Sequence, residues 1–487
     1  MATKTWNGTD GQFNSALDWS SGTVPVPGDM AVINAGTVTS TQPLQAGLVV
    51  ALVATSSTVP ALVLRDADIA AGATVHGETA ASAASLRLTG QVRNAGNITF
   101  DGAGGTTVIG VQDDGNGVAG RFENDGGLSL VGQTAYLASQ STAAAGSFVN
   151  NGVVSVRGDT TAYVNAPVSG AGQIRVGDGN GLQLSAAVGA GQRIILEPGT
   201  GASQLRLTDA GEYAGVISGF GASDVIRLTS GRWDSSSVSS ANGTSTLSLT
   251  LAGAAVARVA FEGAYTAANL SLSSSYDPST AQQTTVLSTT VADRTPVIAF
   301  TDTTNSVSGI EAAKAYIGPV AGLQWEYLWS SPDAVAMAAQ VPNVFLHGGP
   351  GGDALLAKSG SNVLDGGGGS NFLVGASGSD GGADTFFVDG RGGVETWSTI
   401  VNFHPGDAAT IFGFHAGTST LPWTASDGAP GSMGATIHSE LNGAGTGVNG
   451  SMTFAGIDLA TVQSHFAITT GNVGGSDYLL IQYLRPA

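Results

Sequence analysis

The stretch that decides the fold is the nonapeptide GGPGGDALL at residues 348–356. It satisfies the pattern G-G-x-G-x-D-x-U-x of a parallel β-roll, in which U is a large apolar residue. Three further nonapeptides follow without a gap, namely AKSGSNVLD at 357–365, GGGGSNFLV at 366–374 and GASGSDGGA at 375–383. In such a roll each nonapeptide forms half a coil, because the glycines turn the chain and the apolar residue enters the core. The pattern therefore predicts a short stack of coils.

The sixth residue of every nonapeptide carries a side-chain oxygen, and these residues are Asp353, Asn362, Asn371 and Asp380. Residues two nonapeptides apart stack in adjacent coils, so we expect Asp353 over Asn371 and Asn362 under Asp380. Each pair then combines one carboxylate with one amide. Such oxygens, together with turn carbonyls, suit calcium. A glycine-rich roll that binds no metal is the alternative.

A shorter unit repeats in the amino-terminal half, where a glycine is followed by apolar residues at the second and fourth positions. Apolar residues two apart form one face of a short strand, and the Asn/Asp/Gly clusters before the glycines favour turns. The spacing is typical of one coil of a parallel β-helix. An antiparallel sandwich built from hairpins is the alternative. The units are Gly96 with Ile98 and Phe100, Gly126 with Leu128 and Leu130, Gly152 with Val154 and Val156, and Gly172 with Ile174 and Val176, with a shifted copy at Gly191.

The amino end has a different composition, with Trp6 and Trp19 close together in the sequence. The terminal coil of a solenoid needs capping residues, because one side of its core has no neighbouring coil. We therefore predict that the two tryptophans cover the open end of a solenoid over 1–204. A platform on which a carbohydrate ring stacks is the alternative.

A longer duplication links the middle of the chain to its end. VISGFGASDVIRL at 216–228 parallels TIVNFHPGDAATI at 399–411. We therefore predict two copies of one β module, over 205–295 and 384–487. Between the two copies, we predict that residues 296–345 form a linker.

Two short helices are predicted inside this linker. Ser308 begins a capping-box pattern, and Gly318 closes it. Ser331 precedes a proline at the first helical position, and the second helix runs to about Gln340. The predicted fold is thus all-β, with a parallel β-helix or β-solenoid, two β modules, a short β-roll over 346–383 and a small helical insertion.

Composition restricts the partners and the compartment. The 487 residues include 73 glycines and no cysteine, and 36 acidic residues against 17 basic ones give a net charge of −19. This charge would repel nucleic acid, so we predict no nucleic-acid partner. Without cysteine there is no disulfide scaffold and no thiolate metal site. A bound cation is the cross-link that we expect instead.

No long apolar stretch is present, so we predict no membrane span. The apolar run at 46–54 is too short to cross a bilayer, and residues 1–8 lack the apolar region of a secretion signal. If the chain is exported, we expect the export signal at the carboxyl end, where YLLIQYL at 478–484 is apolar.

The nonapeptides, with PNVFLHGGPGGD at 342–353 and GSNVLDGG at 360–367, resemble the RTX or hemolysin-type calcium-binding proteins, in particular secreted alphaproteobacterial surface and biofilm proteins. The resemblance covers roughly residues 300–487. It implies type I export as an unfolded chain, folding in the millimolar calcium outside the cell, and a role at the cell surface. The calcium ligands that it implies are Gly349, Gly351, Asp353, Asn362, Asp365, Asn371, Asp380 and Asp384.

Catalytic patterns are weak. The chain has no His-Glu-x-x-His motif and no Gly-x-Ser-x-Gly elbow with a credible partner histidine. Aspartates in turn-like sequences are more often solvated loop residues than members of a catalytic groove. We therefore predict that the protein is not an enzyme. The histidines are scattered singly, at His76, His347, His404, His415, His438 and His465. The aspartates considered for a groove are Asp113, Asp114, Asp159 and Asp178, and those interpreted as turn formers before strands are Asp224 and Asp407.

The predicted function is that of a secreted, calcium-dependent structural protein that self-associates into a surface layer, a filament or a biofilm matrix. The ends and edges of a solenoid expose backbone groups through which subunits can continue the stack. A calcium-dependent adhesin that binds cell-surface polysaccharide is a near alternative. An extracellular polysaccharide lyase or epimerase is the alternative from a different class.

Overall fold

The computed structural model describes most of the chain, in two compact units. The N-terminal unit comprises Met1–Arg294 with Asn305–Gly309, and the C-terminal unit comprises Thr295–Thr304 with Ile310–Ala487. The described residues are 2–8, 10–54, 58–79, 84–101, 106–114, 119–132, 134–139, 146–230, 232–279, 281–294, 297–303, 307–318, 320–329, 331–379, 382–391, 395–441 and 449–485.

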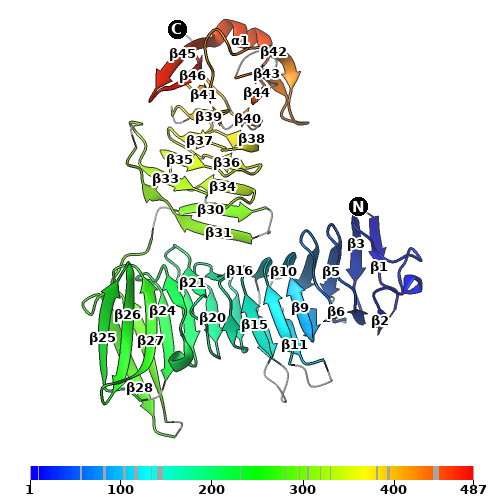
Figure 1. Ribbon diagram of the computed structural model, residues 1–487, viewed down its shortest axis with the longest axis vertical. Coiled ribbons are helices and arrows are strands. Elements are labelled where there is room, and N and C mark those ends of the chain that lie inside the picture. Colours follow the sequence, from blue (N-terminus) through cyan, green and yellow to red (C-terminus); the bar gives the residue numbers. More distant parts are fainter. Residues whose placement is uncertain are drawn as a thin grey trace. The chain divides into compact units, whose positions relative to one another are not determined.

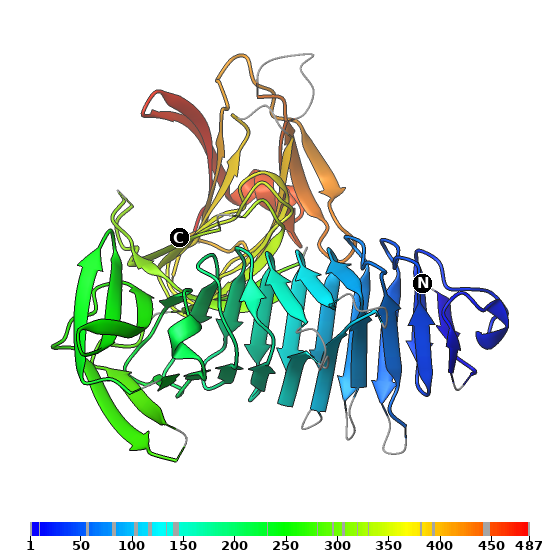
Figure 2. The same cartoon turned by 60° about the horizontal axis from the view of Figure 1, so that its bottom comes forward.

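The N-terminal unit is a parallel β-helix whose coils lie side by side (Figures 1 and 2). Two long sheets and one short sheet form its sides, so the predicted solenoid is confirmed and the antiparallel sandwich is excluded for these coils. Sheet A contains, in spatial order, β1 (Ala2–Thr5), β3 (Asp29–Ile33), β5 (Val49–Ala54), β7 (Thr74–Thr79), β10 (Asn97–Asp101), β13 (Gly127–Val131), β16 (Val153–Arg157), β19 (Gln173–Val176), β21 (Arg193–Leu196), β23 (Val216–Ser218), β27 (Ala254–Glu262), β26 (Thr244–Leu251) and β25 (Ser235–Ala241).

Sheets B and C complete the coils. Two short 3₁₀ turns, η1 (Ala16–Asp18) and η2 (Ala210–Glu212), lie between strands. Sheet B contains β2 (Asp10–Gln12), β4 (Thr37–Ser40), β6 (Ala61–Arg65), β8 (Ala84–Thr89), β11 (Thr106–Gln112), β14 (Thr134–Ser139), β17 (Thr161–Val164), β20 (Gly181–Leu184), β22 (Gln204–Leu207), β24 (Val225–Ser230), β29 (Gln282–Thr289) and β28 (Leu270–Asp277). Sheet C contains β18 (Val168–Ser169), β15 (Ser147–Asn150), β12 (Arg121–Asn124) and β9 (Gln91–Asn94).

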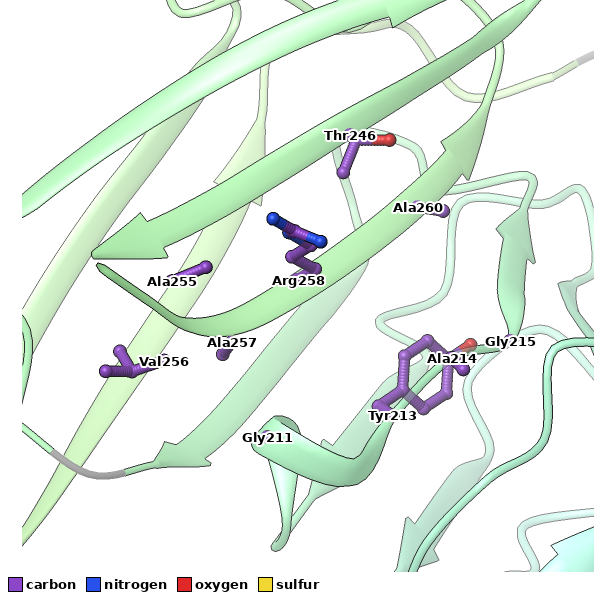
Figure 3. Close-up of a pocket in the computed structure, with 10 residues that line it drawn as sticks. All are labelled: Gly211, Tyr213, Ala214, Gly215, Thr246, Ala255, Val256, Ala257, Arg258 and Ala260. Atoms are coloured by element: carbon purple, nitrogen blue, oxygen red, sulfur yellow. The ribbon is translucent and has the colours of Figure 1, made fainter. Parts of the chain in front are cut away.

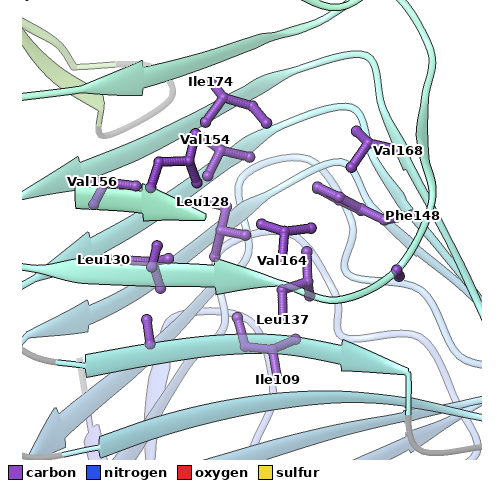
Figure 4. Close-up of a cluster of buried hydrophobic side chains, with 14 of the residues drawn as sticks. Ile109, Leu128, Leu130, Leu137, Phe148, Val154, Val156, Val164, Val168 and Ile174 are labelled. Atoms are coloured by element: carbon purple, nitrogen blue, oxygen red, sulfur yellow. The ribbon is translucent and has the colours of Figure 1, made fainter. Parts of the chain in front are cut away.

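The repeated glycines of the sequence stack on one another at the entrance to sheet A. A Cβ atom on Gly126 would overlap the carbonyl oxygen of Gly96, and a Cβ on Gly152 would overlap that of Gly126. Only glycine lets successive turns approach this closely. Two residues after each glycine, an apolar side chain enters the core, which Figure 4 shows for Leu128, Val154 and Ile174.

A column of buried amides lines the corner between sheets C and A. Asn94 donates to Asn124 at 2.8 Å, Asn124 donates to Asn150 at 2.9 Å, and Asn150 donates to Gln192 at 3.0 Å. The three asparagines are fully buried. The clusters interpreted as turn formers therefore also form a hydrogen-bonded ladder, which satisfies polar groups inside the coil.

The amino end is closed by aromatic side chains. Trp6 and Trp19 are buried, with ring centroids 5.1 Å apart, and Phe13 packs on Trp19 at 5.2 Å. The Trp19 indole donates to the Phe13 carbonyl at 2.8 Å. The tryptophans thus cap the core as predicted, and their faces are not available as a carbohydrate platform.

The C-terminal unit is a second parallel roll, with its strands in two sheets (Figure 1). Its α-helix α1 (Leu459–His465) follows the last parallel strand. Sheet D contains β31 (Val307–Ala312), β30 (Val297–Asp302), β34 (Val335–Ala339), β36 (Ala354–Leu356), β38 (Gly369–Val374), β40 (Thr396–Val401), β44 (Gly450–Ala455), β43 (Gly434–Ser439) and β42 (Trp423–Asp427). Sheet E contains β32 (Lys314–Ala315), β33 (Trp325–Leu328), β35 (Val344–His347), β37 (Val363–Asp365), β39 (Thr385–Asp389), β41 (Ala408–Phe412), β46 (Ser476–Tyr483) and β45 (Phe466–Val473).

Both units end with the same strand order. In the first unit β27 runs parallel to β23 and carries the antiparallel strands β26 and β25, while β29 and β28 continue antiparallel from β24. In the second unit β44, β43 and β42 extend β40 in the same way, and β46 and β45 extend β41. The duplicated sequences lie on β23–β24 and β40–β41. Each module continues the sheets of its roll, so 205–294 belongs to the same compact unit as 1–204.

The two helices predicted in the linker are wrong. Residues of both segments form strands, because Ser308 lies within β31 and β34 follows Ser331. In β34 the side chains of Val335, Met337 and Ala339 alternate into the core. Local capping signals predicted a helix, but pairing with β30 and β36 satisfies the backbone and buries the apolar alternation, which a helix would not do.

We predict that Asn124→Ala destabilises the protein by roughly 2–4 kcal/mol, because it leaves polar atoms of two buried neighbours unpaired. Urea unfolding of the full chain measures this change. Asn151→Ala, at an exposed position of the next coil, is the control and should cost less than about 1 kcal/mol. Equal destabilisation by both variants would contradict a structural role for the buried ladder.

Candidate metal centre

One stack of polar side chains follows the nonapeptide turns in sheet D. Asp353 Oδ1 accepts from the Val335 backbone N–H at 2.8 Å, and Asp353 Oδ2 accepts from that of Gly349 at 2.6 Å. The Asp353 N–H in turn donates to Asn371 Oδ1 at 2.9 Å. The predicted stacking of Asp353 on Asn371 is therefore present. Burial of Asp353 raises the pKa of its carboxyl.

A second stack follows sheet E. The Val344 N–H donates to Asn362 Oδ1 at 3.1 Å, that of Asn362 donates to Asp384 Oδ1 at 2.9 Å, and that of Asp384 donates to Asp407 Oδ1 at 2.7 Å. The residue that stacks on Asn362 is Asp384, 22 residues further on, and not Asp380. The register departs from two nonapeptides because four extra residues precede β39. Asp380 itself lies outside the described residues.

The turns that carry these stacks are held close by glycine. Gly367 and Gly369 have positive φ values of 72° and 75°. A Cβ on Gly367 would overlap the carbonyl oxygen of Gly349, and one on Gly369 would lie 2.6 Å from that of Gly351. The carbonyl oxygens of both predicted glycine ligands thus point toward the next turn.

Asp365, another predicted ligand, takes part in a different arrangement. Its Oδ2 lies 2.9 Å from His347 Nδ1, and its Oδ1 accepts from the Gly367 N–H at 3.0 Å. The pair lines a groove of about 600 Å³, whose wall also includes Trp329. The hydrogen bond to Asp365 raises the pKa of His347. Asp365 is therefore an ion-pair partner at the groove and does not belong to either buried stack.

Three metal-ligating side chains meet where the second stack ends. Asp384, His404 and Asp407 each offer a ligand atom, and these atoms all lie within 4.8 Å of one another. His404 Nδ1 lies 3.4 Å from Asp407 Oδ1, and both carboxylates are about 1% exposed. This is the only such group of three within the described ranges. Sequence reasoning included Asp384 but missed His404 and Asp407, because the β39–β41 pairing brings them together.

The electrostatics of this cluster are unfavourable without a cation. Burial raises the pKa of Asp384. Burial, followed by the nearby charge of Asp384, raises the pKa of Asp407 to about 6, while hydrogen bonds from backbone N–H groups and the charge of His404 act in the opposite direction. His404 Nε2 is buried, has no hydrogen-bond partner among the described residues, and faces Gly378. Two buried carboxylates against one imidazole leave an excess of negative charge.

The donor set fits a hard divalent cation at its oxygens. Carboxylate, amide and carbonyl oxygens are calcium ligands, and each carboxylate oxygen that accepts one N–H keeps a further lone pair. Asp384 and Asp407 would provide the charged ligands of such a site, whereas the Asn362 amide donates to Asp384 and turns its oxygen toward Val344. The imidazole of His404 is a nitrogen donor and favours zinc or another transition metal over calcium. Chemistry alone thus allows either class of ion at this end of the stack.

The N-terminal unit offers a natural comparison, because its module has the same hydrogen bonds without the cluster. In each module the aspartate side chain accepts the backbone N–H of the residue three positions before it. The distance is 2.8 Å from Gly221 to Asp224 and 2.9 Å from His404 to Asp407. Burial likewise raises the pKa of Asp224 to about 6. The counterparts are Ser203 for Asp384, Gly221 for His404 and Asp224 for Asp407.

The remaining candidates lack a convergent set of catalytic groups. Asp159 and Asp178 lie in turns after β16 and β19, whereas Asp113 and Asp114 follow β11 at another corner of the coil. A cavity of about 630 Å³ between η2 and the hairpin β26–β27 is lined mainly by alanine and glycine, with Arg258 as its charged side chain (Figure 3).

Comparison with protein-family models and with curated protein sequences finds no match. Within the described residues, no helix has the length and apolar character that crossing a membrane requires.

We predict that, in the presence of a chelator, the contribution of Asp407 to the stability of the protein falls as the pH rises between about 4 and 6. Because burial raises the pKa of Asp407, the folded state holds the proton more tightly than the unfolded state, so stability is greatest below the ordinary carboxyl pKa and is lost as the pH rises through about 6. Asp407→Asn should remove roughly 1–3 kcal/mol of this pH dependence. The measurement is urea unfolding across that range.

Asp224→Asn is the matched control, because it removes the equivalent aspartate from the module that lacks His404 and Asp384. If the unfolding transitions of the two units separate, each variant should alter the transition of its own unit. A pH profile identical in wild type and Asp407→Asn would contradict the role given to Asp407.

Proposed function

We propose that this chain is an extracellular structural protein whose C-terminal roll folds around divalent cations, with calcium as the principal ion. The observation that carries the proposal is the presence of buried carboxylates in both stacks of a glycine-rich roll, Asp353 in one and Asp384 and Asp407 in the other. Ionised carboxylates are costly to bury without a counter-charge. A cation that binds only the folded roll would convert this cost into stabilisation, since its binding free energy adds to that of folding.

The proposed requirement for calcium favours a site of action outside the cell. The chain has a net charge of −19 and no cysteine, so it needs a cross-link other than a disulfide in an oxidising environment. Calcium is scarce inside cells and abundant outside them, so a roll that needs it would fold after export. Type I export of the unfolded chain is part of this proposal.

Exposed strand edges support self-association. β25, at the end of sheet A, has six exposed residues of seven and no further strand on its outer side among the described residues. β28 in sheet B, β42 in sheet D and β45 in sheet E are likewise last in their sheets. An unpaired edge can accept a strand from another copy. This property supports the proposed assembly into a surface layer, filament or biofilm matrix.

An enzyme is the weaker alternative. A polysaccharide lyase or epimerase needs acid and base groups along one groove, and the aspartates of the N-terminal unit lie at different corners of its coils. The same fold would also suit an adhesin, for which a groove on sheet B is the candidate binding surface.

We predict that purified full-length protein forms ordered polymers in millimolar calcium and that a chelator disperses them, because calcium orders the roll and reduces repulsion between acidic subunits. Negative-stain electron microscopy before and after chelation measures the assembly. Protein that stays monomeric in calcium and cleaves or epimerises an acidic polysaccharide would overturn the proposal.

Asp384→Asn separates a specific site from general charge screening. It removes one buried carboxylate, and we expect it to raise the calcium concentration needed for folding about tenfold, equivalent to roughly 1.4 kcal/mol of lost cation affinity. Asp224→Asn removes the same charge from the N-terminal unit and should leave that concentration unchanged. Circular dichroism during calcium and, separately, zinc titration gives the midpoints. Equal shifts in both variants would contradict a defined site.

A further inference from the structure

The outer face of sheet B carries a shallow groove that the cation proposal does not use. It has a volume of about 290 Å³, crosses β17, β20, β22 and β24, and its lining includes Thr161, Tyr163, Gln183, Arg206 and Arg227. β20 and β24 are labelled in Figure 1.

The groove follows one column of outward-facing residues on successive coils. Tyr163 pairs in register with Gln183, Gln183 with Arg206, and Arg206 with Arg227. Tyr136 precedes Tyr163 in the column, with ring centroids 5.0 Å apart and an interplanar angle of 15°. Since parallel strands are about 4.8 Å apart, the column presents an aromatic ring, an amide and two guanidinium groups at regular steps.

A glycine creates the space at the aromatic end. Gly181 lies on β20 in register with Thr161 and Gln204, so the neighbouring column has no side chain at this coil. One face of the Tyr163 ring is stacked on Tyr136, while its other side borders the groove. A flat, partly apolar ring of ligand can pack there.

Two arginines of this acidic chain, Arg206 and Arg227, lie in register along the groove. Neither has a carboxylate within ion-pair distance among the described residues, whereas Arg93 pairs with Asp125 and Arg193 with Glu262 elsewhere in the same unit. Arg227 donates to Gln204 at 2.9 Å, which holds its guanidinium at the groove. Two like charges in register on adjacent strands destabilise a sheet, and an anion placed between them would remove that cost.

We infer that this groove binds an acidic sugar unit of a polysaccharide, with the sugar ring against Tyr163, hydroxyls on Gln183 and Gln204, and the carboxylate on Arg206 and Arg227. The ligand class is therefore a uronate-containing glycan. Two guanidinium groups match one carboxylate, whereas nucleic acid binding needs many phosphate contacts and is opposed by the net charge of −19. This inference goes beyond the proposed structural function and does not depend on the cation site.

The test uses the full-length protein at constant millimolar calcium, with titration calorimetry of short oligosaccharides of hyaluronan, mannuronate and galacturonate. A neutral cello-oligosaccharide and a single-stranded oligonucleotide are the competing probes. We expect at least one uronate to bind, the neutral glycan to bind at least about tenfold more weakly, and Arg206→Gln/Arg227→Gln to weaken uronate binding at least about tenfold. Tyr163→Ala should also weaken it, with less dependence on salt.

Arg87→Gln is the matched control, because Arg87 is exposed on β8 of the same sheet and lies outside the groove. Its replacement removes one positive charge, as the replacement of each groove arginine does. It should alter uronate affinity by no more than about twofold, and thermal unfolding must show that all variants remain folded. The inference is overturned if no uronate binds better than the neutral glycan, if Arg87→Gln weakens binding as much as Arg206→Gln/Arg227→Gln does, or if the oligonucleotide binds best. If the protein forms no polymers in millimolar calcium but still binds uronate, the structural proposal is refuted and the groove inference is not.

Discussion

Polar groups enclosed at the corners of the parallel coils need hydrogen-bond partners, and both units meet this constraint with stacks of side chains. In the N-terminal unit the amides of the ladder from Asn94 to Gln192 bond to one another and donate to backbone carbonyl oxygens. In the C-terminal roll, amide and carboxylate oxygens such as those of Asn362 and Asp384 accept backbone N–H groups of the neighbouring coil. Because an amide is neutral and a carboxylate is charged, the two kinds of stack differ in their electrostatics.

The duplicated module makes this difference visible. Both copies place an aspartate before the same strand, and both extend their sheets in the same order. In the first copy the residue stacked on Asp224 is Ser203, whereas in the second the residue stacked on Asp407 is Asp384. A second carboxylate, together with His404, turns a local hydrogen-bonding position into a candidate metal centre.

Predictions based on repetition succeeded where the repeat directly controls contact. The glycine column identified the coils because a side chain at Gly126 would overlap the preceding turn. The nonapeptide spacing placed Asp353 on Asn371, since nothing is inserted between them. Predictions based on local signals were less successful. The helices expected after Ser308 and Ser331 are strands, because the sheets on either side provide backbone partners and burial that a capping motif cannot outweigh.

The candidate site was only partly accessible to sequence reasoning. Asp384 belonged to the predicted set, but its stacking on Asn362 depends on a four-residue insertion, and its proximity to His404 depends on which coil follows. Arg206 and Arg227 are 21 positions apart by their numbers and have no shared motif, yet they face the same groove. Coil length varies, so the residues that meet on one face are set by the number of residues in the loops.

By itself, the sequence determined the all-β architecture, the location of the coils, the acidic charge and the oxygen-rich turns, because these properties depend on composition and on spacing within one or two coils. Only the tertiary structure decided which carboxylates share a site, which histidine joins them and which arginines form a groove. Those decisions depend on the register between coils, and register is the sum of all insertions and strand pairings along the stack.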